Sequence, residues 1–108
     1  MKVVISLGGS VIIPEEVDYK YLEKFSKVIK KFSKRNKIVI VTGGGSTARK
    51  YIDPLVKLKK GEKAYSAVGI SSTRINARLV RRIFGFSGRF PIEIKHVKND
   101  LKKNNLVI

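Results

Sequence analysis

Two glycine-rich segments, each preceded by an apolar run, are the part of this sequence best suited to bind a phosphate. Residues 39–41 (Val-Ile-Val) lead through a threonine into three glycines at 43–45, and residues 3–7 lead into Gly8 and Gly9. Glycine lets the backbone approach an anion closely, and a helix N-terminus presents unpaired N–H groups to it. Two such turns on one edge of a sheet would form a pocket for a polyphosphate. A pair of tight structural turns is the competing interpretation, and the occurrence of two favours the pocket.

The apolar pattern predicts the elements that would place both turns on one edge. Residues 2–7 and 37–42 are predicted strands, and a helix capped by Asp18 and ending near Arg35 is predicted between them. The apolar side chains of this helix are predicted to face the sheet: Leu22, Phe25, Val28, Ile29 and Phe32. Such a unit is a right-handed βαβ crossover with a parallel sheet, in which ligands bind beyond the carboxyl ends of the strands. Both glycine turns are expected there.

Downstream of the second turn the pattern predicts two helices and two more strands. A helix from Ser46 is expected to bend or end early at Pro54, because proline lacks an N–H. Its inward-facing residues are predicted as Ala48, Tyr51, Ile52, Leu55 and Leu58. Residues 64–84 form a long predicted helix whose first half is rich in small residues, as expected where a ligand or another backbone approaches.

The last part of the chain is predicted as a strand at 91–94, a short helix or turn at 97–104, and a strand that begins at 106. A strand that opens at the final residues predicts a larger fold that has been truncated or split.

The composition indicates a basic domain without cysteine, which excludes disulfides, thiolate metal sites and a thiol nucleophile. No apolar run approaches the roughly 20 residues of a membrane span, and the pattern of a signal peptide is absent, so we expect a soluble cytoplasmic protein. Twenty-four Lys and Arg residues against eight Asp and Glu give a net charge of +16, which attracts polyanions such as nucleotides and nucleic acids. A lysine-rich solvated surface explains the same charge, and both interpretations stay open.

Three segments of the sequence resemble one protein family. Residues 5–10 (Ile-Ser-Leu-Gly-Gly-Ser), residues 39–52 with their three glycines and Ala48-Arg49-Lys50, and residues 69–77 (Gly-Ile-x-x-Thr-Arg-x-Asn-Ala) are similar to the amino-acid kinase superfamily. They most resemble its archaeal-type uridylate kinase (UMP kinase) branch. The resemblance implies an α/β fold, a three-layer αβα sandwich with a mainly parallel sheet. It also implies transfer of the ATP γ-phosphoryl group to UMP with Mg²⁺, and a homo-oligomer, typically a hexamer.

The resemblance also implies which residues contact ATP. Gly9 and Ser10 of the first turn would contact the ATP phosphates, and Gly45 and Arg49 after the second turn would face ATP. Phosphoryl transfer needs positioning and charge neutralisation more than a covalent partner, and backbone N–H groups and an arginine fork supply both.

For the acceptor, the resemblance implies that Gly44 lies against UMP. Ser66 stands where the family has an aspartate that binds the nucleoside, and a serine hydroxyl can still hydrogen-bond a ribose. No catalytic residue is assigned, because Ser6 stands where related kinases often carry Lys or Asp. No metal-ligand set is predicted, and the only histidine, His96, receives no role.

The resemblance covers the N-terminal half of the family fold. Residues 1–108 would be the phosphate-acceptor-binding half, without the C-terminal ATP-binding half, so we expect UMP kinase activity only when a separate C-terminal half is supplied. The isolated chain is expected to be unstable or to aggregate through its open sheet edge. The alternative is a non-catalytic basic module that binds nucleic acid or a nucleotide, although an aromatic-rich strand motif and zinc spacing are absent. A Rossmann enzyme is disfavoured, since neither turn spells Gly-x-Gly-x-x-Gly.

Overall fold

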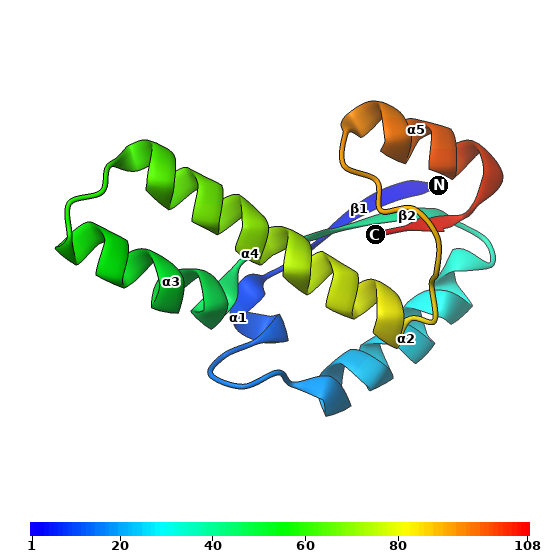
Figure 1. The fold of residues 1–108 in the computed structure, drawn as a ribbon. Coiled ribbons are helices and arrows are strands. Elements are labelled where there is room, and N and C mark those ends of the chain that lie inside the picture. The colour runs from blue at the N-terminus through cyan, green and yellow to red at the C-terminus, as the bar shows by residue number, and fades with distance from the viewer.

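The computed structural model describes residues 1–108 and contains a three-stranded parallel sheet with helices on both faces (Figure 1). In chain order the elements are β1 (Lys2–Leu7), α1 (Gly9–Ile12), α2 (Tyr19–Ser33), β2 (Lys37–Thr42), α3 (Gly45–Lys57), α4 (Glu62–Ile83), α5 (Ile94–Lys103) and β3 (Leu106–Val107). The strand order is β1-β2-β3, and Val39 of β2 pairs with Val4 of β1 and Val107 of β3. The predicted αβα layering and the βαβ unit are confirmed.

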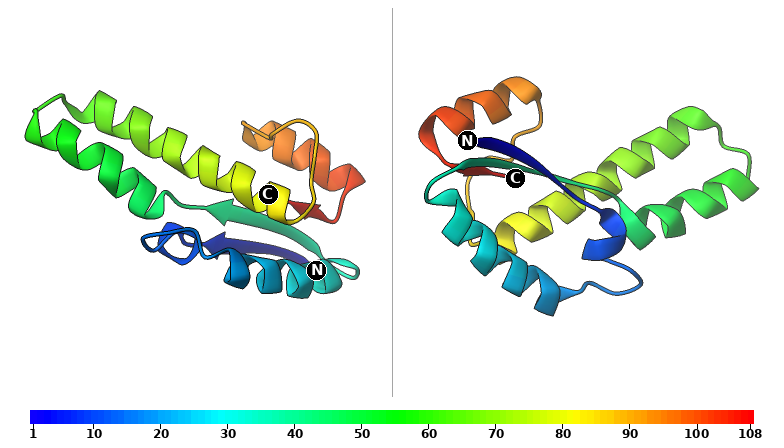
Figure 2. Two further views of the ribbon diagram at one scale, coloured as in Figure 1. Left: turned by 60° about the horizontal axis from the view of Figure 1, so that its bottom comes forward. Right: turned by 180° about the vertical axis from the view of Figure 1, so that it is seen from behind.

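One face of the sheet carries the hydrophobic core. Ile38 and Ile40 of β2 are fully or almost fully buried, and α2 together with the C-terminal end of α4 covers them (Figure 2). The ring of Phe84, just after α4, lies edge-on to Phe25 of α2 with a centroid distance of 6.1 Å. This packing joins the two helices over the sheet.

Helix α2 begins as predicted, because the Asp18 side chain accepts a hydrogen bond from Tyr21 N–H at 3.2 Å. Its buried residues are Leu22, Ser26 and Ile29. The inward placement predicted for Val28 and Phe32 is wrong, since these side chains are 65% and 47% exposed. The buried stripe is therefore narrower than the apolar pattern suggests.

The second face of the sheet is only partly covered. Helix α5 lies on this side, opposite α2, and Val107 is buried here (Figures 1 and 2). Val4 lies on the same face as Val107, because both align with Val39 in the parallel register, and it is 71% exposed. Val41 on this face is 52% exposed. An uncovered apolar sheet face remains beside the edge strand β1.

Helices α3 and α4 form a hairpin that projects beyond the carboxyl ends of the strands (Figure 1). Helix α3 passes through Pro54 and ends at Lys57, so the early end expected at Pro54 is wrong. The predicted inward orientation is also wrong for Tyr51 and Leu58, which are 65% and 66% exposed. These residues lie on the part of the hairpin that extends past the sheet, where no further layer packs on them.

The strand predicted at residues 91–94 is wrong, because α5 begins at Ile94. Glu93 caps this helix: its side chain accepts from the His96 backbone, and His96 Nδ1 accepts from Glu93 N–H at 3.3 Å. The only histidine therefore has a structural role in a capping box. The strand predicted from residue 106 is confirmed as β3. None of the helices combines the length and apolar character needed to cross a bilayer.

Candidate functional site

The two glycine turns meet at the carboxyl end of the sheet. A Cβ added to Gly9 would fall 2.7 Å from Gly44 N and closer still to Gly45 N, and a Cβ on Gly43 would fall 2.9 Å from Gly9 N. Gly45 has a φ of +60° and its backbone lies against Gly9 O. Only glycine allows this approach, because any side chain would overlap the opposing backbone. The expectation that both turns lie on one edge is confirmed.

The turns touch so closely that no ligand can lie between them. Any phosphate must therefore bind beside the contact, on the α4 side or on the α1 side. Gly44 N–H, just before α3, has no acceptor among the loop and cap hydrogen bonds, and Ser46 Oγ is buried without a hydrogen-bond partner in the first turn of α3. Buried polar groups are usually paired, so these free groups leave hydrogen-bonding capacity at the start of α3.

A buried amide from α4 holds the second turn in place. Asn76 is 3% exposed, and its Nδ2 donates to Gly43 O at 2.8 Å and to Gly44 O at 3.0 Å. Nearby, Thr42 Oγ1 donates to Thr73 O at 3.1 Å. These bonds fix the direction of two peptide planes in a turn that has no side chains of its own. Sequence reasoning gave Asn76 no role, although its position four residues after Ser72 and four before Val80 places it on the buried face of α4.

On the α4 side, a cavity of about 550 Å³ lies between the second turn and α4. Gly44, Gly45 and Ala48 line one wall, and Ser66, Gly69, Ile70, Thr73 and Arg74 line the other. The structure thus brings together the predicted residues Gly44, Gly45 and Ser66. The volume lies within the range of small-molecule sites. Of the small residues predicted to admit a ligand or a backbone, Gly69 lines this cavity, whereas Ala67, Ser71 and Ser72 do not.

The cavity carries positive charge. Arg74 forms no ion pair, since the three salt bridges of the chain join Glu23–Lys27, Asp53–Lys57 and Glu93–Lys95. No acidic side chain lines the cavity, because Ser66 occupies the one position where the family resemblance led us to expect an acid. An anionic ligand therefore meets an unneutralised guanidinium here. Arg74 is the cavity residue that sequence reasoning missed.

On the α1 side, Arg49 connects α3 to the first turn. Its guanidinium donates to Ser10 Oγ at 3.4 Å and to Pro14 O at 3.5 Å. Lys50, the next residue of α3, also reaches the segment after α1, because its Nζ donates to Glu15 O at 3.4 Å. Ser10 and Arg49 are both exposed and lie together. The four residues predicted to contact ATP therefore cluster around the contact between the turns.

Two predicted features lie outside these groups. Ser6 is exposed and aligns with Val41 on the partly covered face of the sheet, and it lines neither side of the turn contact. No group of three or more His, Cys, Asp or Glu side chains lies close enough together to hold a metal ion.

Comparison with known proteins places this geometry in a family. A model of the amino acid kinase family matches residues 1–105. The chain belongs to the amino acid kinase family. It is 37% identical to the uridylate kinase of Thermoplasma acidophilum over 107 residues, covering 98% of this chain and 46% of that protein. It is 39% identical to the uridylate kinase of Thermoplasma volcanium over 107 residues, covering 98% and 47%.

The fold agrees with a solved member of this family. The crystal structure of uridylate kinase from Archaeoglobus fulgidus superimposes with a TM-score of 0.87 at 32% identity. The match covers 99% of this chain and 49% of that one. The chain thus spans about half the length of the archaeal uridylate kinases that it matches, and corresponds to their N-terminal portion.

Proposed function

We propose that this chain is the acceptor-binding half of a cytoplasmic uridylate kinase, which transfers the γ-phosphoryl group of ATP to UMP. The acceptor site is the cavity between the second glycine turn and α4, where Gly44 lies against UMP and Ser66 hydrogen-bonds the ribose. One observation carries the proposal: a nucleotide-sized cavity has as its wall the glycine turn, whose Gly44 N–H has no acceptor among the loop and cap hydrogen bonds. The likeness to archaeal uridylate kinases supports the choice of nucleotide.

ATP approaches from the α1 side of the turn contact. Gly9 and Ser10 contact its phosphates from the first turn, and Gly45 and Arg49 face it from the start of α3. The bond between Arg49 and Ser10 supports this arrangement, because it holds a guanidinium beside the first turn. In this arrangement the two phosphate groups that react meet across the glycine contact.

The chemistry of this half is charge neutralisation and positioning. The attacking UMP phosphate and the transferred phosphoryl group are both anionic, so cations and N–H donors aimed at them lower the barrier. Arg74 supplies a cation on the acceptor side and Arg49 one on the donor side. Ser6 and Ser66 contribute no charge where related kinases carry charged residues. Mg²⁺ enters as its ATP complex, a role that the likeness to uridylate kinases supports.

Turnover requires the second half of the family fold. The relatives are about twice as long as this chain, and we assign the remaining ATP contacts to the half that it does not match. That half is supplied by another polypeptide or segment, and the assembled kinase is a homo-oligomer, a hexamer by its resemblance to the family. The prediction is activity in the assembly and none in the isolated chain.

The acceptor site can be tested directly by titrating the ¹⁵N-labelled chain with UMP and recording amide chemical shifts. Shifts are expected at Gly44, Gly45 and residues 66–74, and weaker ones with uridine, which lacks the phosphate. Arg74→Ala should raise the Kd for UMP by about tenfold, because a charge-assisted hydrogen bond is worth about 1.5–3 kcal/mol.

Arg82→Ala is the matched control, since Arg82 is an exposed arginine of the same helix and lies outside the cavity. It should leave UMP binding unchanged. The proposed acceptor site would be wrong if UMP shifted amides elsewhere, or if both arginine variants bound UMP as the parent chain does.

A further inference from the structure

Three connected cavities surround the end of the sheet opposite the glycine turns. They measure about 380, 580 and 380 Å³ and are lined by the first residues of β1, β2 and β3. The first cavity shares Phe86 and Asn104 with the second, and the second shares Lys34 and Asn105 with the third. They therefore form one continuous path, called here the basic rim, around this end of the molecule.

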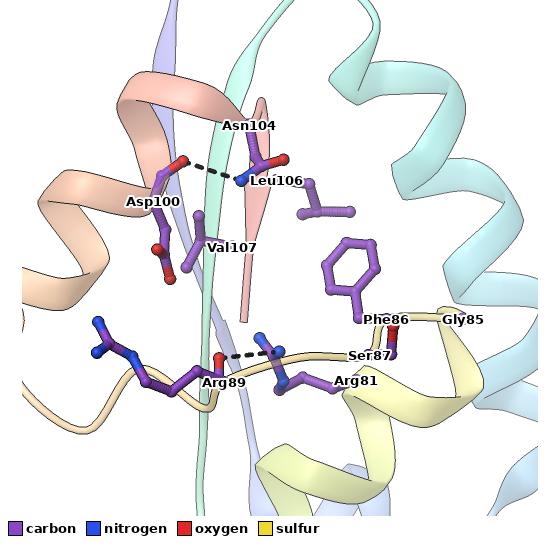
Figure 3. A pocket seen from close by; sticks show the side chains of 9 residues that line it. All are labelled: Arg81, Gly85, Phe86, Ser87, Arg89, Asp100, Asn104, Leu106 and Val107. Atoms are coloured by element: carbon purple, nitrogen blue, oxygen red, sulfur yellow. Dashed lines mark hydrogen bonds between the residues drawn. The ribbon is translucent and has the colours of Figure 1, made fainter.

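The first cavity of the basic rim holds two arginines beside the free edge of β3 (Figure 3). Arg81 is held in position, because it donates to Ile108 O and to Arg89 O at 3.3 Å each and lies 5.9 Å from the ring centroid of Phe86. Burial lowers the pKa of the Arg81 guanidinium, Asp100 raises it, and Arg82 lowers it. An arginine remains protonated under such conditions, so a fixed, partly desolvated cation borders the cavity.

Lysines dominate the other two cavities, and one of them, Lys37, donates from Nζ to Leu101 O. Lys30, Lys34 and Lys103 line the second, on α2 and α5. Lys2, Arg35 and Lys37 line the third together with Lys34, around the start of β1 and β2. Half-buried Phe86 lines both the first and the second cavity, and its ring packs against Arg81 and Phe84.

The charge of the basic rim is almost unopposed. Its eight Lys and Arg side chains face one acid, Asp100, which forms no ion pair within 4.0 Å. The three salt bridges of the chain all lie outside these cavities. Like charges held together repel one another, so a ligand that brings several negative charges at once is favoured.

The shape of the basic rim selects among polyanions. The molecule measures 49 × 31 × 23 Å, so a path around one of its ends has a small radius of curvature. Duplex DNA has a persistence length of roughly 150 bp, and bending it this sharply would cost free energy. A single strand bends freely, its phosphates can follow cations, and its bases can stack on aromatic rings. We propose that the basic rim binds single-stranded nucleic acid, at the end of the molecule opposite the proposed nucleotide site.

Fluorescence anisotropy with a 5′-labelled 15-nucleotide RNA of mixed sequence tests this proposal. Binding to the parent chain should weaken steeply between 50 and 200 mM salt. Replacing Lys30, Lys34 and Lys103 by Gln should raise the Kd at 50 mM salt at least tenfold. It should also reduce the slope of log K against log[salt] by about 2, since each lost phosphate contact to a single strand accounts for about 0.7.

The matched control replaces Lys20, Lys60 and Lys63 by Gln, which removes the same net charge from exposed positions outside the basic rim. This control should change the Kd less than threefold. Equal losses in the two variants would overturn the proposal, because net charge alone would then explain binding. Displacement of the RNA by polyglutamate of equal charge would also overturn it and assign the surface to an acidic polypeptide.

Discussion

At the scale of single residues, Asn76 explains how a turn without side chains keeps a defined shape. Both amide hydrogens of Asn76 are used, one on Gly43 O and one on Gly44 O, and the residue is 3% exposed. Buried amides that lose their partners are costly, and so are carbonyls left unpaired. The shape of the second glycine turn is therefore set from α4, across the cavity that α4 also lines.

Replacing Asn76 by Ala should lower the free energy of unfolding by about 1–3 kcal/mol, because Gly43 O loses its donor and Gly44 O keeps only Ala48 N–H. Urea denaturation followed by circular dichroism measures this change. Asn99→Ala is the control, since Asn99 is an exposed asparagine on α5, and it should stay within about 0.5 kcal/mol of the parent. A similar small effect for Asn76→Ala would contradict the role given to this amide.

Two glycines should respond oppositely to the same methyl group. Gly9→Ala should destabilise the fold by about 3 kcal/mol or more, because its Cβ would overlap the backbone of Gly44 and Gly45. Gly69→Ala should stabilise it by about 0.5–1 kcal/mol, since Gly69 is helical and its Cβ would meet only Ile52 Cδ1 at 3.6 Å. Thermal denaturation of both variants measures the pair. If Gly9→Ala proved as stable as Gly69→Ala, the two glycine turns would have to be able to separate.

At the scale of elements, α3 buries few of its own side chains. Only Ser46 of this helix is buried, and Pro54 interrupts its hydrogen bonding because it cannot donate to Lys50 O. Packing on α4 nevertheless keeps the segment helical to Lys57. The proposed nucleotide cavity lies at the start of α3, where the glycine contact and Asn76 fix the backbone.

Pro54→Ala should therefore raise the free energy of unfolding by about 1–3 kcal/mol and increase the helical signal, because the missing hydrogen bond is restored. Urea denaturation and far-UV circular dichroism check both. Val56→Ala, at a 49% exposed position of the same helix, should change little. A loss of stability in Pro54→Ala would instead indicate that the proline is needed for packing on α4.

Some elements of the fold could be predicted from the sequence pattern and others could not. The strand–turn–helix order, the Asp18 cap and the meeting of the glycine turns were predictable, because each depends on local residue chemistry. The strand predicted at 91–94 failed because the alternation of Ile92 and Ile94 resembles a strand, whereas Glu93 and His96 start a helix. Exposure of Tyr51 and Leu58 depends on which layers cover them, and periodicity carries no information about that.

Some residues of the candidate site could likewise be predicted from the sequence, and others could not. The family resemblance grouped Gly44 with Ser66 and assigned Gly45 to the other nucleotide, and all three line one cavity. Asn76 and Arg74 required the structure, because a polar residue in a helical pattern gives no indication of what it contacts across the fold. The cavities of the basic rim join residues up to about a hundred positions apart in the chain, and sequence reasoning saw only their total charge.

At the scale of the whole molecule, two opposite ends carry different chemistry. The glycine turns and the α3–α4 hairpin form one end, and the basic rim forms the other, with the sheet between them (Figure 1). Between the ends, Val4 and Val41 expose an apolar sheet face next to the unpaired edge of β1. Exposed apolar surface of this kind favours association, and we expect it to be covered in the assembled kinase.

The most direct measurement is the UMP kinase activity of a chimera in which this chain replaces the matching N-terminal portion of Thermoplasma acidophilum uridylate kinase. The folded chimera should phosphorylate UMP with ATP and Mg²⁺ in a coupled ADP-release assay, while the isolated chain should not. Arg49→Ala in the chimera should reduce kcat at least tenfold, because a cation facing the phosphates is lost. A folded, monodisperse chimera that binds ATP but does not phosphorylate UMP would contradict the assignment of this chain as the acceptor half of a uridylate kinase.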